Sequence, residues 1–169
     1  MSDDTRTNEE FVRDIYDASY RRLVGQLFVV VGDLATAEDV VQEAFVRAVA
    51  HAHSFRRTDN PEAWLHRVAL NVQRSRWRRL KTFAGLRHKL AEPEPLPDLP
   101  ADHVALLAAL RSIPKSQRES IVLHHLADRP VHEVAATLGV PTGTVKARLS
   151  RGRAALATML GDPEEDGHA

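Results

Sequence analysis

The 169-residue chain contains no cysteine. This absence excludes disulfides, thiolate catalysis and cysteine-ligated zinc. Aromatic residues are scarce, with two Trp, two Tyr and five Phe. Strands favour aromatic and β-branched side chains, whereas Ala, Leu, Val and Arg dominate here. The composition therefore predicts an all-α protein.

Long apolar runs are also missing. No run is long enough to span a bilayer, and the first twenty residues are polar, unlike a secretory signal. We therefore expect a soluble, cytoplasmic protein that does not insert into membranes.

Signals of catalysis are absent from the sequence. It has no glycine-rich phosphate loop, nucleophile elbow or HExxH motif. Its nine histidines show no metal-ligand spacing. We expect no catalytic residue, metal, cofactor or small-molecule substrate, and an enzyme is the least favoured class.

The formal net charge is zero, but the charges are unevenly distributed. Residues 1–53 hold five Lys/Arg and ten Asp/Glu, and residues 54–81 hold eight and two. Residues 142–158 hold four cations and no acid. Two separate basic blocks predict two contacts with a polyanion. The acidic first third indicates a different partner or a solvated surface.

Helical periodicity predicts a first domain over residues 8–83. Its helices are expected from Asn8 to Phe28, from Thr36, whose hydroxyl is expected to act as the cap, and from Pro61. The segment between the last two helices, His51 to Asn60, is predicted to be a polar loop.

A linker is predicted over residues 84–103, because residues 91–100 contain four prolines. A second helical domain is predicted over 104–160, and the acidic tail 161–169 is expected to be disordered. Within the second domain we expect helices at Val104–Leu110 and Ser116–Leu126. The second of these is predicted to point Ile121, Val122 and Leu126 inward.

The second domain ends in a predicted helix-turn-helix. The helix that begins near Glu133 is expected to stop at Gly139, because glycine adopts the left-handed conformation cheaply. Pro141 prevents an early restart, and Thr142 is expected to cap the next helix.

Helical spacing divides the following helix into two sides. Its packed face is predicted to hold Val145, Leu149, Gly152 and Leu156. The outer side carries small, polar or cationic residues suited to DNA, namely Thr144, Lys146, Arg148, Ser150 and Arg151. The alternative is an ordinary solvated helix.

The other basic block spans Asn71 to Lys81. Arg74, Arg78 and Lys81 share one helix face, and Arg76 and Arg79 share another. Trp64 precedes the block, and Trp77 lies within it. Trp64 is expected to pack in the core, whereas Trp77 fits equally a core position or stacking on unpaired bases.

An acidic stripe lies on the second predicted helix. Asp39, Gln42 and Glu43 share a face at spacings of three and four. Composition alone favours a solvated surface, and the alternative is a docking surface for a basic partner.

Taken in chain order, these motifs resemble those of bacterial sigma factors of the extracytoplasmic-function (ECF) type. Residues 39–48, DVVQEAFVRA, are similar to the region that binds the β′ coiled coil of RNA polymerase. Residues 61–79 are similar to the region that recognises and melts the −10 element. Residues 110–126, 133–139 and 143–153 are similar to the domain that recognises the −35 element.

The resemblance implies a sigma factor that directs promoter-specific initiation. Its implied partners are core RNA polymerase, through the β′ and β subunits, promoter DNA and an anti-sigma factor. The implied core-binding residues are Asp39, Gln42 and Glu43. The implied −10 residues are Asn71, Arg74, Trp77, Arg78 and Arg79, and the loop Ser54 to Asn60 matches one that captures a flipped base. The implied −35 residues are Thr144, Lys146, Arg148, Ser150 and Arg151.

Two positions depart from the family pattern. Ser75 stands where an acid is frequent, and His132 stands where an aromatic is frequent. Two other functions stay open. A dimeric helix-turn-helix regulator would leave the block Asn71 to Lys81 unexplained. An adaptor would occupy polymerase without initiating.

Overall fold

The computed structural model describes residues 2–83 and 100–161. Every regular element in these ranges is helical, which confirms the predicted all-α class. The chain divides into two compact units, with the boundary between Glu94 and Pro95, and each unit is described by itself. Residues 84–99 of the predicted linker and 162–169 of the predicted tail lie outside the described residues.

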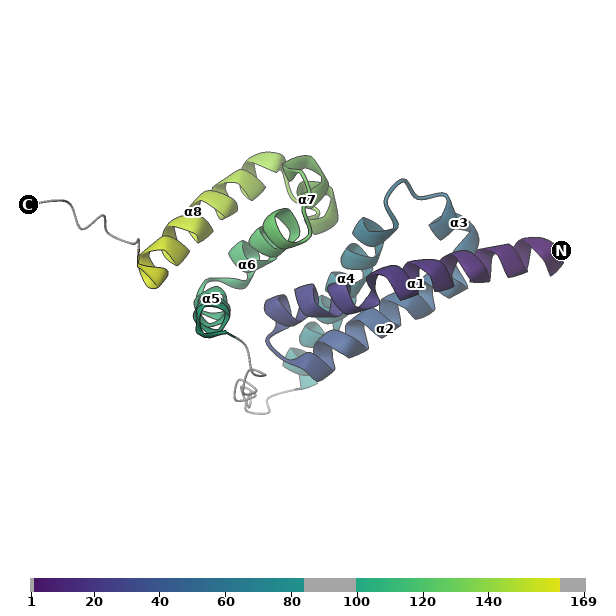
Figure 1. Cartoon of the computed structure of the whole chain (residues 1–169), viewed down its shortest axis with the longest axis horizontal. Coiled ribbons are helices and arrows are strands. Elements are labelled where there is room, and N and C mark those ends of the chain that lie inside the picture. Colours follow the sequence, from purple (N-terminus) through teal and green to yellow (C-terminus); the bar gives the residue numbers. More distant parts are fainter. Residues whose placement is uncertain (1, 84–99, 162–169) are drawn as a thin grey trace, which may run out of the picture. The chain divides into compact units, whose positions relative to one another are not determined.

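The first unit contains α1 (Ser2–Val31), α2 (Leu34–Ala50), α3 (Ala52–Arg56) and α4 (Pro61–Phe83). Figure 1 shows α1 and α2 as an antiparallel pair, and α4 packs against both. The shared core is aliphatic, with buried side chains that include Leu23, Leu27, Val40, Val41, Ala44, Leu65, Ala69 and Leu70. Burial of this apolar stripe is the main term that fixes α2 and α4 together.

The turn between α1 and α2 corrects one prediction. Gly32 has a φ of 87°, which glycine adopts cheaply. Asp33 then caps α2, because its carboxylate accepts the Thr36 N–H at 2.7 Å and also the Thr36 hydroxyl. Thr36 was therefore wrong as the cap. The Asp33 carboxylate reaches the first-turn N–H, so α2 begins at Leu34.

The predicted loop from His51 to Asn60 is wrong in part, because it contains α3. Phe55 of α3 is fully buried, and its ring centre lies 5.9 Å from Phe11 and 5.0 Å from Trp64. Burial of this one aromatic anchors an otherwise polar segment. Trp64, which was predicted to pack in the core, is half-buried and packs its ring against Phe55.

Polar contacts fix α4 against α1. His66 is buried, and its Nε2 lies 2.7 Å from Gln26 Oε1. At the surface, Arg22 of α1 forms an ion pair with Glu62 in the first turn of α4. These contacts determine which face of α4 points outward.

The second unit contains α5 (Ala101–Ser112), α6 (Lys115–Ile121), the π-helical turn η1 (Val122–Leu126), α7 (Val131–Leu138) and α8 (Thr142–Leu160). Its aliphatic core includes Leu110, Ile113, Ile121, Val122, Leu123, Val134, Leu138, Val145 and Leu149. Arg118 closes the end of α5 by donating to the carbonyls of Leu110 and Arg111, at 3.3 and 3.1 Å. Burial lowers the pKa of this guanidinium, and Glu119 acts in the opposite direction.

The π-helical turn corrects another prediction. The Ala127 N–H donates to the Val122 carbonyl, five residues back, at 2.9 Å. This wider turn breaks the spacing that placed Leu126 inward. Ile121 and Val122 are buried as predicted, but Leu126 is 42% exposed.

The turn between α7 and α8 follows the prediction at Gly139, whose φ is 66°. Thr142 was wrong as the cap, because Pro141 holds that position and Thr142 is already helical. The Pro141 carbonyl accepts the N–H groups of Thr144 and Val145 at 3.0 and 3.3 Å.

The predicted packed face of α8 is confirmed. Its four residues, Val145, Leu149, Gly152 and Leu156, are all buried. A Cβ at Gly152 would lie 2.5 Å from Ile121 Cδ1, so the missing side chain allows α8 to approach α6. This contact fixes the side of α8 that faces away from the core.

Candidate nucleic-acid and partner interfaces

The acidic stripe of α2 lies on the surface of the first unit. Asp39 and Gln42 are exposed, and Glu43 is partly exposed. Gln42 Nε2 donates to Tyr20 Oη at 3.4 Å, and Glu43 Oε1 accepts from Arg47 Nε at 3.0 Å. The structure thus presents all three predicted partner-binding side chains to solvent, each held by a weak surface contact.

Asp39 has a partner on a different helix. Its Oδ2 lies 3.5 Å from Nη1 of Arg76 in α4. Sequence patterns could not indicate this pair, because the two residues are far apart in the chain. It brings the acidic stripe of α2 next to the basic block of α4.

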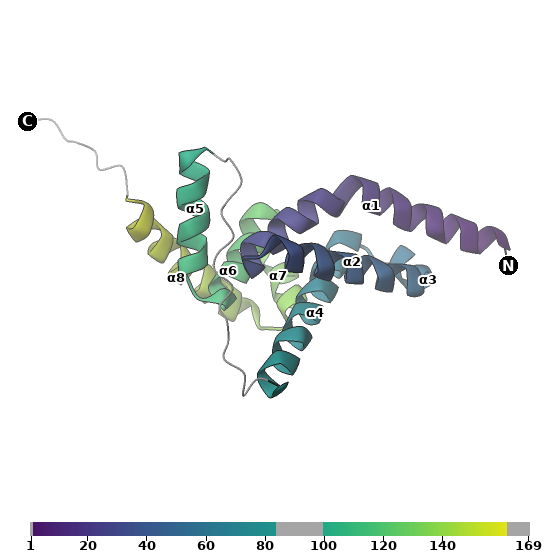
Figure 2. The ribbon, with the colours of Figure 1, turned by 90° about the horizontal axis from the view of Figure 1, so that it is seen from below.

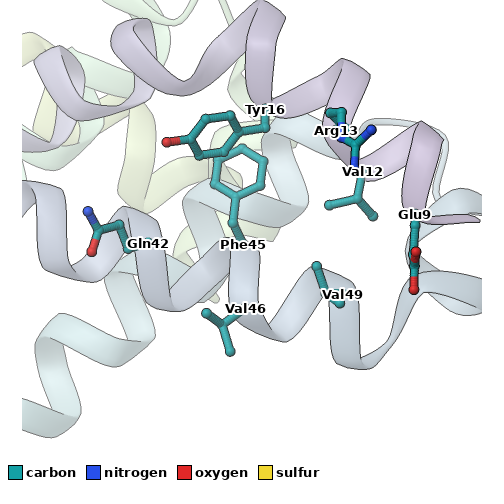
Figure 3. A pocket seen from close by; sticks show the side chains of 8 residues that line it. All are labelled: Glu9, Val12, Arg13, Tyr16, Gln42, Phe45, Val46 and Val49. Carbon is teal, nitrogen blue, oxygen red and sulfur yellow. The ribbon is translucent and has the colours of Figure 1, made fainter.

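An apolar groove continues from Gln42 along α1 and α2. It has a volume of about 540 Å³, and Figure 3 shows its lining side chains, Glu9, Val12, Arg13 and Tyr16 from α1 and Gln42, Phe45, Val46 and Val49 from α2. Tyr16 packs its ring edge-on against Phe45, with ring centres 5.0 Å apart. Sequence analysis missed this groove. Its signal was Val46 and Val49, two exposed valines on an otherwise amphipathic helix.

The basic block occupies the second half of α4. Asn71, Arg78 and Arg79 are exposed, and Arg74 is partly exposed. Trp77 is 38% exposed, and Lys81 Nζ lies 5.5 Å from its ring centre. Trp77 is therefore a surface residue, which removes the core alternative. All five predicted −10 residues lie on a helix that has no acid after Glu62.

The outer side of α8 carries the second set of predicted DNA contacts. Lys146, Ser150 and Arg151 are exposed, and Thr144 and Arg148 are partly exposed. The helix contains no Asp or Glu over residues 142–160. The five side chains therefore form a polar, cationic surface opposite the packed face, and such a surface suits a major groove.

Histidines gather at the π-helical turn. The rings of His124 and His125 meet edge-on with centres 4.7 Å apart, and His124 Nδ1 lies 2.7 Å from the Arg129 carbonyl. Burial lowers the pKa of His125, and the nearby His124 and Arg153 lower it further. Within residues 2–83 and 100–161, no group of three or more His, Cys, Asp or Glu side chains has the arrangement of a metal site.

Comparisons with known protein families identify the class of protein to which this chain belongs. Residues 15–83 match the family model Sigma-70 region 2, and residues 103–156 match Sigma-70, region 4. Both models describe parts of sigma factors, which direct RNA polymerase to promoters. The first model covers α2 and α4, and the second covers the helix-turn-helix.

Whole-chain relatives narrow the class further. The chain is 31% identical to the ECF RNA polymerase sigma factor SigW of Bacillus subtilis, over 92% of this chain and 91% of the relative. It is 33% identical to the RNA polymerase sigma-E factor of Streptomyces coelicolor, over 90% and 85%. The chain therefore belongs to the ECF family of RNA polymerase sigma factors, and it directs promoter-specific transcription initiation by core RNA polymerase.

Solved structures show the same architecture. The sigma factor RpoE of Bartonella quintana, in complex with the anti-sigma factor NepR, matches with a TM-score of 0.74 and 26% identity, over 90% of this chain and 97% of that one. CnrH, in complex with the cytosolic domain of CnrY, shares the fold with a TM-score of 0.65. Among the described residues, no helix has both the length and the apolar character needed to cross a membrane.

Proposed function

We propose that the chain acts through three surfaces, α2 on core polymerase, α4 on the −10 element and α8 on the −35 element. The observation that carries this division is the separation of charge. The exposed face of α2 presents Asp39 and Glu43, whereas α4 after Glu62 and the whole of α8 contain cations and no acid. Phosphate contacts need such cation-rich surfaces, and a basic protein partner needs the acidic one.

The polymerase surface consists of Asp39, Gln42 and Glu43 and docks on the β′ coiled coil. The groove beside Gln42 adds apolar area next to these polar groups. An interface of this kind gains most of its affinity from buried apolar anchors. Val46 and Val49 are exposed on the groove wall and supply such anchors.

The −10 surface consists of Asn71, Arg74, Trp77, Arg78 and Arg79, together with the segment Ser54 to Asn60. The cations hold the phosphates, and the exposed Trp77 ring offers a face for an unpaired base. Capture of separated bases offsets part of the cost of unstacking, which is a few kcal/mol per base by analogy with base flipping.

The −35 surface consists of Thr144, Lys146, Arg148, Ser150 and Arg151 and binds intact duplex. The N-terminal turns of a recognition helix contact base edges, and its cations contact phosphate. We place the first DNA-binding domain at 8–83 and the second from Ala101, where α5 begins, to residue 160, so that each binds its own promoter element.

The protein acts by binding alone, without catalysis, in the cytoplasm. Its zero net charge fits weak, salt-sensitive DNA binding in the absence of polymerase. An anti-sigma factor is its expected inhibitor, and the matched RpoE structure contains such a partner, the anti-sigma factor NepR. Because this chain has no cysteine, any thiol sensing belongs to that partner.

The test is run-off transcription on a genomic-fragment library, using purified core polymerase with and without the protein. Discrete new start sites that share two upstream motifs support the proposal and reveal the promoter. Co-elution with core without new starts would indicate an adaptor instead. Failure of both, with folded protein, would indicate a free-standing DNA-binding regulator.

A further inference from the structure

The last turns of α4 project beyond the helices that pack against its first half (Figure 2). Side chains on the inner face are buried up to Val72, whereas every residue from Trp77 to Phe83 is exposed. This stretch nevertheless contains large apolar side chains. Leu80 is 61% exposed and Phe83 is 81% exposed.

These apolar residues form a continuous band along the projecting helix. At 100° per residue, Leu80 lies between Trp77 and Phe83 around the helix axis. Cations border the band on both sides around the axis, with Arg79 beyond Phe83, and Lys81 and Arg78 beyond Trp77. The projecting end of α4 is therefore apolar in its centre and cationic at its edges.

We propose that Leu80 and Phe83 extend the DNA surface of α4, and that the Phe83 ring stacks on an unpaired base of the promoter strand. The inference rests on the proposed function of α4 and adds two residues to it.

The charges and the aromatic ring together indicate which ligand binds the projecting end of α4. Six cations and no acid lie on α4 after Glu62, which favours a polyanion over a protein partner of mixed charge. Intact duplex offers phosphates but hides the faces of its bases, so it gives the exposed ring no base to stack on. A separated strand offers phosphates and open base faces together, and these match the cationic edges and the exposed ring.

The experiment measures holoenzyme affinity for a forked promoter fragment with an unpaired non-template strand, taken from a start site found by run-off transcription. Two substitutions separate stacking from simple apolar contact. Phe83→Leu keeps an apolar side chain but removes the aromatic face, and Phe83→Tyr keeps the face. We expect Phe83→Leu to weaken binding about tenfold, within the range measured for single stacked bases, and Phe83→Tyr to stay within about twofold of the wild type.

An abasic scan of the unpaired strand locates the partner base. At one position, loss of the base should weaken wild-type binding and remove the difference between wild type and Phe83→Leu. Leu80→Ser should also weaken forked-DNA binding. The matched control, Leu160→Ser at an exposed leucine that ends α8, should not.

Several outcomes would overturn the inference. Equal forked-DNA affinities for wild type and Phe83→Leu would exclude stacking. A loss of affinity for core polymerase instead of DNA would assign the band to a protein contact, and a selective loss of binding to phosphatidylglycerol vesicles would assign it to a membrane. If wild-type holoenzyme itself fails to bind forked DNA, the proposed function of α4 fails as well, so the two failures are distinguishable.

Discussion

Arg76 Nη1 lies 3.5 Å from Asp39 Oδ2, so an ion pair joins the helix proposed to bind polymerase to the helix proposed to bind DNA. Both side chains are substantially exposed, at 40% and 63%, and a pair of this kind contributes about 0–1 kcal/mol. We expect that a polymerase cation that pairs with Asp39 would leave Arg76 available to bind phosphate. Core docking and DNA binding would then be weakly coupled through this one ion pair.

The first prediction follows from this pair. Asp39→Asn should raise the affinity of the free protein for a single-stranded oligonucleotide about two- to fivefold, the equivalent of one surface ion pair. Fluorescence anisotropy across a salt series measures it, and the slope of log K against log salt should steepen by about 0.7.

The control for this coupling is a double-mutant cycle. In an Arg76→Gln background, Asp39→Asn should raise DNA affinity only as much as the loss of any surface acid does. Asp17→Asn, at an exposed position of α1, measures that general effect. If Asp39→Asn raised DNA affinity as much in the Arg76→Gln background as in the wild type, its effect would not depend on the ion pair with Arg76.

A second prediction separates the two functions. Glu43→Lys reverses a charge on the polymerase surface and should weaken binding to core at least about tenfold, while −35 DNA binding is retained. Arg148→Ala should do the reverse, with a loss of about 1–3 kcal/mol in −35 recognition and unchanged core binding. Co-elution with core and binding to a −35 duplex fragment are the two measurements.

Folding must be controlled in this pair of variants. Glu43→Lys also breaks the contact with Arg47, which contributes about 0.3–0.5 kcal/mol to stability, so thermal unfolding should change little. If both variants lose the same function to the same degree, the division of roles between α2 and α8 is wrong.

The predictions from sequence were most accurate where periodicity decides the structure. The packed face of α8 and the helix stop at Gly139 both follow from spacing and from glycine's freedom at positive φ. The predictions were wrong where a local interaction that periodicity does not show changed the structure. Asp33 replaced Thr36 as the cap of α2, because its carboxylate accepts the N–H of Thr36 itself and the helix already begins at Leu34. A π-helical turn moved Leu126 outward.

The candidate site was less predictable than the fold. Sequence patterns place individual side chains on helix faces, but they cannot show contacts between distant helices. The pair Asp39–Arg76 and the groove lined by Tyr16 and Phe45 exist only after α1, α2 and α4 have packed. Phe55 shows a different limit of sequence patterns. Its buried ring holds α3 in a segment whose composition is typical of a loop.

A third prediction concerns the contact between α6 and α8. Gly152→Ala places a Cβ 2.5 Å from Ile121 Cδ1. Overpacking of about 1–3 kcal/mol should exceed the gain of up to about 1 kcal/mol in helix propensity, so the second unit loses stability. Ile121→Val removes Cδ1 itself, and in that background Gly152→Ala should be neutral or stabilising.

Urea unfolding can assign this effect to one unit. Trp64 and Trp77 are the two tryptophans, and both lie in the first unit. Far-UV circular dichroism should therefore show the loss in Gly152→Ala, while the tryptophan fluorescence transition stays unchanged. Additive effects of the two substitutions would contradict the contact.

The last prediction concerns pH. Burial, His124 and Arg153 lower the pKa of His125 in the folded chain below its usual value of 6.5. The unfolded state then binds more protons than the folded state near and below pH 6.5, so the second unit should lose stability as the pH falls through that region and keep it above. Urea midpoints followed by circular dichroism between about pH 5 and 8 measure this loss. His125→Gln should flatten the acidic side of the curve, because glutamine cannot take up the proton. An identical pH dependence in wild type and His125→Gln would show that the acid sensitivity of the second unit arises from other groups.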